Sequence, residues 1–174
     1  MRSVLAATNY QISPLEKEHN RNAFSCGEDS LDNYFQQQAG QDSRKRVSAI
    51  YVLRDLELEK IAGFYTLSAT NIELTNLPEP LQKKLPSYPR IPATLLGRLA
   101  IDKTYQKNSL GEILLIDALK RSYKASIGVA SFAVVVDAIN ENAKNFYKKY
   151  GFSDLHRNTN LNQLFIPMGS IKQL

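Results

Sequence analysis

The chain has 174 residues, of which 43% are hydrophobic and 22% are charged, and its formal net charge is +5. This length and composition fit one globular domain over residues 1–174 and exclude a disordered or collagen-like chain. No apolar run reaches the ~20 residues of a membrane span, and the N-terminal apolar stretch is too short for a signal peptide, so we expect a cytoplasmic protein without a membrane partner.

The first half of the chain favours a helix followed by antiparallel strands. Residues 29–44 predict a helix, because apolar side chains recur at helical spacing and Asp29 or Ser30 can cap its start. Two β-rich runs, 47–54 and 60–69, are separated by a short polar segment and predict a hairpin.

The middle of the chain adds further elements around a central strand. Residues 71–77 favour a third strand, and 78–85 a short helix with proline near its start. Residues 91–101 predict the central strand, whose regular part we expect to begin only after Pro92, because proline lacks the N–H that a strand ladder uses. A long, mostly apolar helix is expected at 110–126.

The last part of the chain predicts a buried strand, a capped helix and a terminal strand. Residues 131–137 are apolar, as in strands covered on both faces. Residues 140–150 form an amphipathic helix that Asn140 caps and Gly151 ends, and 164–168 form the last strand. The elements together predict an α+β fold in which a strand-helix-strand unit forces a parallel pair.

The stretch from Leu95 to Glu112 has the character of an anion-binding segment. A branched apolar run ends, a polar turn with few acids follows, and a long helix begins near Gly111. Backbone amides that precede a helix N-terminus bind phosphate well, so the sequence predicts a cofactor that carries phosphate.

The cysteine and histidine residues do not indicate a disulfide, a metal site or a catalytic triad. The single cysteine, Cys26, excludes an intrachain disulfide and fits a small packed residue, and the two histidines, His19 and His156, have no recognisable catalytic or ligating setting. We therefore expect no metal site and no catalytic triad.

Two signatures at the expected spacing resemble those of the GCN5-related N-acetyltransferases, the GNAT superfamily. Its acetyl-CoA loop, Q/R-x-x-G-x-G/A, is matched by Gln106 to Gly111 with Ser109 at the middle glycine, and its N-x-x-A-x-x-x-Y signature by Asn140, Ala143 and Tyr147. The resemblance implies a GNAT fold, which is a central, mixed, mostly antiparallel sheet with helices on both faces.

A narrower resemblance covers residues 24 to 168. The chain is similar to acetyltransferase toxins of bacterial type II toxin–antitoxin modules, in the segments FSCG with LDNYF, AGFYTLSA, LLGRLAID, VVVDA and FIPM. This implies acetylation of the α-amino group of aminoacyl-tRNA, a block of translation, a ribbon-helix-helix antitoxin and a homodimeric toxin.

The resemblance assigns an acetyl-CoA site without a metal. The pantetheine arm is expected to pair with the edge of the strand at 99–101, which also fits a plain core strand, and the diphosphate is expected to bind the loop. On the later helix, Asn142 either hydrogen-bonds the cofactor or is an ordinary helix-surface residue, and Phe146 is expected to contact the cofactor. The expected cofactor-binding residues are Leu99, Ala100, Ile101, Gln106, Lys107, Asn108, Ser109, Leu110, Gly111, Asn142 and Phe146. Ser109 either adds a hydroxyl donor or, if its φ is positive, costs about 1 kcal/mol.

Tyr147 is the expected catalytic residue. By spacing alone it reads as a core tyrosine on the stripe with Ala143 and Phe146, and the match to the family signature favours a role as general acid. A phenol with a pKa near ~10 keeps its proton at neutral pH and can give it to a leaving thiolate.

Basic residues are the candidates for tRNA binding. They are Arg44, Lys45, Arg46, Lys83, Lys84, Arg90 and Arg98. Solvated surfaces or cations at helix C-termini explain the clusters equally well, and Arg98 either lines the acceptor cleft or pairs with an acid. Two other functions stay open: acetylation of a small amine or protein N-terminus, and a non-catalytic GNAT-fold binding protein.

Overall fold

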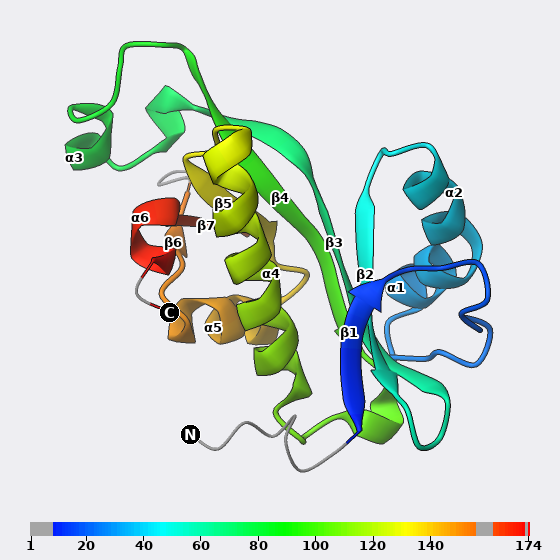
Figure 1. Ribbon diagram of the computed structural model, residues 1–174. Coiled ribbons are helices and arrows are strands. Elements are labelled where there is room, and N and C mark those ends of the chain that lie inside the picture. The colour runs from blue at the N-terminus through cyan, green and yellow to red at the C-terminus, as the bar shows by residue number, and fades with distance from the viewer. Residues whose placement is uncertain (1–8, 156–161, 173) are drawn as a thin grey trace. The chain divides into compact units, whose positions relative to one another are not determined.

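The computed structural model of the protein describes residues 9–155, 162–172 and 174 (Figure 1). His156 and the N-terminal segment 1–8, to which two of the expectations above refer, lie outside the described residues. The chain divides into two units. The first unit comprises Met1–Leu67 and Arg98–Asp117, and the second comprises Ser68–Gly97 and Ala118–Leu174.

The strands form a seven-stranded sheet in the order β1-β2-β3-β4-β5-β7-β6. The strands and their bounds are β1 (Tyr10–Pro14), β2 (Ala49–Asp55), β3 (Lys60–Glu73), β4 (Arg90–Ile101), β5 (Ala133–Asp137), β6 (Ser153–Asp154) and β7 (Gln163–Pro167). The observed mixed, mostly antiparallel sheet confirms the expected fold class, with β4 and β5 as the parallel pair.

Helices make up most of the remaining regular structure. They are α1 (Asp29–Asn33), the π-helix η2 (Tyr34–Gln38), α2 (Ala39–Arg44), η3 (Leu74–Asn76), α3 (Glu79–Gln82), η4 (Lys103–Tyr105), α4 (Leu110–Gly128), α5 (Glu141–Lys149) and α6 (Met168–Ile171). Over the described part of the chain, no helix combines the length and the apolar character needed to cross a bilayer.

The first unit places helices on the two faces of its strands. Phe64 of β3 stacks on Phe35 of η2 with ring centroids 4.2 Å apart, so this face packs against the α1–η2–α2 stretch beside β2 (Figure 1). The preceding residue, Gly63, points to the opposite face because side chains alternate along a strand. An ideal Cβ there would lie 2.9 Å from a Leu114 methyl carbon of α4 and 2.9 Å from the Ala100 carbonyl oxygen. Glycine therefore allows the close packing of β3, β4 and α4.

The second unit has its own core around β5. Thr94–Leu96 of β4 pair in parallel with Val134–Val136, and β5 pairs antiparallel with β7. Its core cluster contains seven buried side chains from these strands and the neighbouring segments: Ile72, Leu77, Ala93, Ala133, Val135, Leu155 and Phe165.

Several expectations about element ends are wrong. The N-cap of α1 is Glu28, without a side-chain hydrogen bond, rather than Asp29 or Ser30. The strand β4 begins at Arg90 and includes Pro92, whose carbonyl accepts a hydrogen bond from the Phe132 N–H. Proline is tolerated there because it precedes the paired residues 94–96 and its missing N–H is not used in that pairing.

Other elements were placed differently or missed. The third strand expected at 71–77 is the continuation of β3 to Glu73, followed by the short helix η3. The strands β1 and β6 and the helix α6 were not expected, because each is short and has no clear periodicity in the sequence.

Candidate active site

The segment that joins β4 to α4 in the first unit has the strand-loop-helix geometry expected of the phosphate loop. Ile101 ends β4, η4 follows, and α4 begins at Leu110. The first N–H groups of a helix have no acceptor within the helix and carry the positive end of its dipole. The loop from Gln106 to Ser109 leads directly into this helix start, so it can present backbone donors to an anion.

Two residues of the loop have left-handed backbone conformations. The φ angle is 66° at Lys107 and 59° at Ser109, and both residues are exposed. Left-handed backbone favours glycine, because a Cβ crowds the following carbonyl. Ser109, which stands where the family pattern has glycine, thus has a backbone conformation that favours glycine.

The side-chain amides of the loop point to protein carbonyls. Gln106 Nε2 donates to the Cys26 carbonyl at 2.9 Å and to the Ile101 carbonyl at 3.0 Å. Asn108 Nδ2 donates to the Tyr105 carbonyl at 3.3 Å. Gln106 and Asn108 therefore fix the loop, and the backbone amides, the Lys107 ammonium and the Ser109 hydroxyl are the donors left for a diphosphate.

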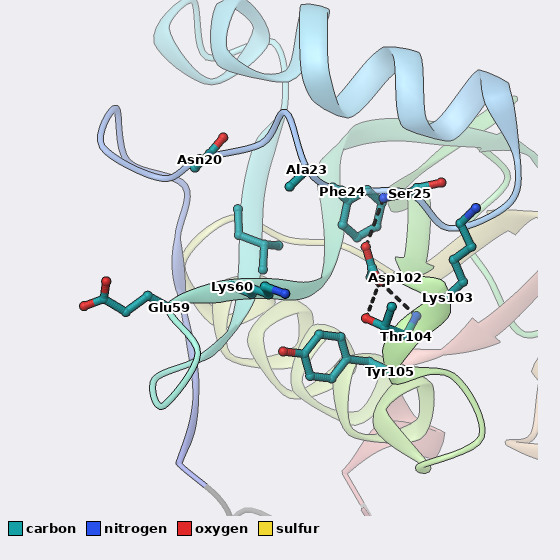
Figure 2. A pocket seen from close by; sticks show the side chains of 11 residues that line it. Asn20, Ala23, Phe24, Ser25, Glu59, Lys60, Asp102, Lys103, Thr104 and Tyr105 are labelled. Atoms are coloured by element: carbon teal, nitrogen blue, oxygen red, sulfur yellow. Dashed lines mark hydrogen bonds between the residues drawn. The ribbon is translucent and has the colours of Figure 1, made fainter.

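Asp102 anchors the start of the loop (Figure 2). Its carboxylate accepts hydrogen bonds from Ser25 N–H at 3.0 Å and from the N–H and hydroxyl of Thr104 at 2.9 and 2.7 Å. Burial by itself raises the pKa of Asp102, but these hydrogen bonds outweigh it and hold the pKa below its ordinary value. Sequence reasoning missed this role, although Asp102 lies in the motif LLGRLAID.

Asp32 holds the segment that Gln106 contacts. Its carboxylate accepts from Cys26 N–H at 2.8 Å and from the Ser25 hydroxyl at 3.3 Å. Burial raises the pKa of the Cys26 thiol to about 11, so this cysteine is an unreactive thiol at neutral pH, as expected.

A pocket of about 180 Å³ opens beside η4 (Figure 2). Phe24, Ser25, Lys60, Lys103 and Tyr105 are among the residues that line it. Tyr105 donates from its hydroxyl to Asp55 at 2.7 Å, and burial together with this hydrogen bond raises its pKa. The hydrogen bond from Tyr105 to Asp55 thus connects η4, which precedes the loop, to the end of β2.

The strand residues expected to meet the pantetheine arm lie at the end of β4. Ala100 is buried in the core cluster with Phe35 and Phe64, whereas Leu99 and Ile101 are half-buried. Asp102 N–H donates to the Ala62 carbonyl at 2.8 Å, so β3 borders β4 within the first unit.

Tyr147 lies on α5 in the second unit. Its side chain is 8% exposed, and its ring centroid lies 5.3 Å from that of Phe146 and 5.4 Å from that of Phe152. Burial raises the pKa of Tyr147. Because burial raises this pKa, the phenol keeps its proton at neutral pH, and among the described residues its hydroxyl has no hydrogen-bond partner.

The start of α5 is as expected. Asn140 accepts a hydrogen bond at its side-chain oxygen from Ala143 N–H at 2.8 Å, and Gly151 ends the helix with a φ of 96°. Asn142 is exposed in the first turn and Phe146 is half-buried. The Asp154 carboxylate of β6 forms salt bridges with two lysines of α5, Lys148 at 2.9 Å and Lys144 at 3.3 Å.

The basic candidates fall in both units. Arg44, Lys45 and Arg46 are exposed at the end of α2 in the first unit. Lys83, Lys84 and Arg90 are exposed in the second unit, and Lys83 pairs with Glu79 at 3.1 Å.

Arg98 has a partner that neither sequence alternative included. Its guanidinium carbon lies 3.4 Å from the ring centroid of Tyr34, within the first unit. The Tyr34 hydroxyl donates to Asp42 at 2.9 Å, and burial together with this hydrogen bond raises the pKa of Tyr34 to about 12. The aromatic ring therefore fixes the position of this cation.

The described residues contain no group of three or more His, Cys, Asp or Glu side chains arranged to hold a metal ion. The cofactor loop belongs to the first unit and Tyr147 to the second.

Comparison with known proteins agrees with this geometry. The model of the acetyltransferase (GNAT) domain family matches residues 91–170, which include the loop and α5. A tRNA-acetylating toxin of Mycobacterium tuberculosis, strain ATCC 25618 / H37Rv, is 32% identical over 131 residues, 75% of this chain and 76% of the toxin.

Solved structures of toxins are also similar. AtaT complexed with acetyl-methionyl-tRNAfMet is 33% identical with a TM-score of 0.87, over 94% of this chain and 98% of that one. A mutant AtaT toxin bound to the C-terminus of the antitoxin AtaR and acetyl-CoA is 29% identical with a TM-score of 0.79, over 94% and 96% of the two chains. The protein belongs to the GNAT acetyltransferases. Within that family its similarity is to the tRNA-acetylating toxins.

Proposed function

We propose that this protein is a toxin that transfers an acetyl group from acetyl-CoA to the α-amino group of aminoacyl-tRNA and so blocks translation. The observation that carries the proposal is the 33% identity, over 94% of the chain, to AtaT in its complex with acetyl-methionyl-tRNAfMet. Membership of the acetyltransferase family supports the reaction class, and the tRNA-acetylating toxin of M. tuberculosis supports the acceptor.

The residues of the first unit suit the binding of acetyl-CoA. The loop residues Lys107, Ser109 and Leu110 precede or begin α4, where unpartnered N–H groups favour a diphosphate. Leu99 to Ile101 offer a strand end to which the amides of pantetheine can hydrogen-bond. Acetyl-CoA, when bound, supplies an activated thioester.

Tyr147 is the proposed general acid. The neutral α-amino nitrogen forms a bond to the acetyl carbon, the carbon–sulfur bond breaks, and the amine gives up a proton to water. The Tyr147 hydroxyl gives its proton to the leaving sulfur and regains one from water. Because the α-amino group of an aminoacyl ester is less basic than a lysine, a useful fraction is neutral near pH 7 and no separate base is needed.

The first test is transfer of label from acetyl-CoA to charged tRNA. Tyr147→Phe keeps the ring packing and removes the acid, so the rate should fall at least about 100-fold, while acetyl-CoA affinity measured by calorimetry stays the same. Tyr150→Phe, on the next turn, is the matched control and should retain the activity.

The other functions predict different results. Label on small amines or protein N-termini but never on tRNA would replace the proposed acceptor with one of these. Failure to bind acetyl-CoA at all would leave only a non-catalytic GNAT-fold binding protein.

We further propose that the toxin is a cytoplasmic, single-domain homodimer neutralised by a ribbon-helix-helix antitoxin. The complex of AtaT with the C-terminus of AtaR supports an antitoxin for this chain. Light scattering should give twice the chain mass. Expression should stop growth, and co-expression of a short neighbouring reading frame should restore it.

A further inference from the structure

A second pocket in the first unit carries an excess of positive charge. It has a volume of about 300 Å³ and lies between the segment after β1 and the helix α2. Its lining residues are Leu15, Glu16, Lys17, Arg21, Gly40, Ser43 and Arg44. Three of them are cationic and one is acidic. Two of the cations, Lys17 and Arg21, were not expected to have a function from the sequence.

Arg21 is held in one position against the helix. Its guanidinium donates to the Phe35 carbonyl, with Nη1 2.8 Å from the oxygen, and the side chain is half-buried. An ideal Cβ on Gly40 would lie only 2.8 Å from Nη2 of Arg21, so the absence of a side chain makes room for the guanidinium. Among the described residues, Phe35 is the one hydrogen-bond partner that the guanidinium has.

The cations of the pocket do not have one common structural explanation. Arg44, in the last turn of α2, is favoured by the helix dipole. Lys17 and Arg21 belong to the segment between β1 and α1, so no helix end accounts for them. Lys17 and Arg44 are exposed, and their ammonium and guanidinium groups can turn toward a ligand.

Phosphodiester groups fit this set of side chains. The Arg21 guanidinium presents paired donors to phosphate oxygens, the exposed Lys17 and Arg44 add charge, and the Ser43 hydroxyl adds a neutral donor. The positive charge continues from Arg44 into Lys45 and Arg46 along the chain. Lys45 and Arg46 are exposed next to the pocket residue Arg44 along the chain, and a polymer with several phosphates can engage them as well as the pocket, which a single small anion cannot.

We propose that the pocket formed by Lys17, Arg21 and Arg44 binds a backbone phosphate of the tRNA acceptor. This inference rests on the proposed function and extends the tRNA-binding surface to the segment after β1. The contact positions the tRNA and does not read its sequence.

The test compares Lys17→Ala and Arg44→Ala with Lys124→Ala, an exposed lysine on α4 outside the pocket. Each pocket variant should raise KM for aminoacyl-tRNA several-fold at unchanged kcat and acetyl-CoA affinity. Each should also lower the slope of log K for tRNA binding against log salt by about 1, because one phosphate contact is lost. The Lys124 variant should match the wild type.

Two variants of the Arg21 position test the geometry. Arg21→Lys keeps the charge without the paired donors, and Gly40→Ala displaces the guanidinium. Both should weaken tRNA binding, with folding checked by far-UV circular dichroism. Activity on a minimal aminoacyl-nucleoside acceptor, which lacks the tRNA backbone, should not change in any of these variants.

The outcomes separate the inference from the proposed function. If the wild type acetylates aminoacyl-tRNA and the pocket variants equal the Lys124 control, the inference is wrong and the function stands. If the wild type does not acetylate aminoacyl-tRNA, the function is wrong, and direct binding of deacylated tRNA still decides the inference. If the variants no longer bind the antitoxin but bind tRNA as tightly as the wild type, the pocket binds an acidic protein segment and the inference is wrong.

Discussion

At the scale of single residues, the cofactor loop depends on backbone conformations that its side chains do not favour. Ser109 and Lys107 have positive φ angles, although neither is glycine. Such conformations are strained for residues with a Cβ and persist only where their surroundings impose them. Here Gln106 ties the loop to Cys26 and Ile101, and Asn108 ties it to Tyr105.

We predict that the conformation of Ser109, rather than its hydroxyl, decides cofactor affinity. Ser109→Gly should bind acetyl-CoA at least as tightly as the wild type. Ser109→Val should bind it more weakly, because a β-branched residue is disfavoured at positive φ. Isothermal calorimetry measures both. Glu59, with a φ of 51° in the turn between β2 and β3, provides the control, since Glu59→Val should lose stability but not affinity. Weaker binding by Ser109→Gly would show that the hydroxyl contacts the phosphate.

We predict a pH dependence of stability that is due to Asp102. Its pKa in the folded protein is lowered, so its contribution to stability is fully present above the unfolded value of ~3.9 and is lost as pH falls through the folded pKa. Asp102→Asn should cost about 1–3 kcal/mol at pH 7 and much less at pH 2. Urea unfolding at the two pH values measures this.

At the scale of elements, the irregular helix η2 contacts two cations that lie far from it in the sequence. The π-helix η2 lies between α1 and α2, and its Phe35 carbonyl accepts a hydrogen bond from Arg21. The same stretch carries Tyr34, which stacks under Arg98. The π-helix η2 therefore fixes the positions of two cations, Arg21 and Arg98. Helical turns of this kind often occur at functional sites.

We predict that the cap of α5 is needed for stability of the helix that carries Tyr147. Asn140→Ala removes the acceptor for Ala143 N–H and should lower the free energy of unfolding by about 1 kcal/mol. Asn145→Ala, at an exposed position inside the helix, is the matched control and should be neutral or slightly stabilising. Urea unfolding gives both values. Equal losses in the two variants would contradict a capping role.

At the scale of the whole molecule, continuous elements connect the two units. The boundaries between the units fall inside β3, β4 and α4, so each of these elements contributes residues to both. A strand or helix that continues through a boundary favours joint folding, because breaking it costs hydrogen bonds in both units. The proposed single domain is consistent with this.

We predict that the protein unfolds in one cooperative transition. Urea curves followed by far-UV circular dichroism and by tyrosine fluorescence should coincide, and the chain offers nine tyrosines and no tryptophan as probes. Two separated transitions would show that the units fold independently.

Most elements near the site could be predicted from local sequence. The cap at Asn140, the end of α5 at Gly151 and the step from β4 into α4 follow from short-range signals that tertiary contacts did not override. The start of β4 at Arg90 could not be predicted in this way, because the tolerance of Pro92 depends on which residues of β4 pair with β5.

The sequence by itself determined the order of the elements, the loop and the helix that carry the two family signatures, and therefore the family. These features depend on neighbours along the chain. Only the tertiary structure decided that Gln106 binds Cys26, that Arg98 stacks on Tyr34 and that Arg21 lies over Gly40. Each of these contacts joins residues at least 19 positions apart, whose meeting depends on packing of the whole first unit rather than on local preference.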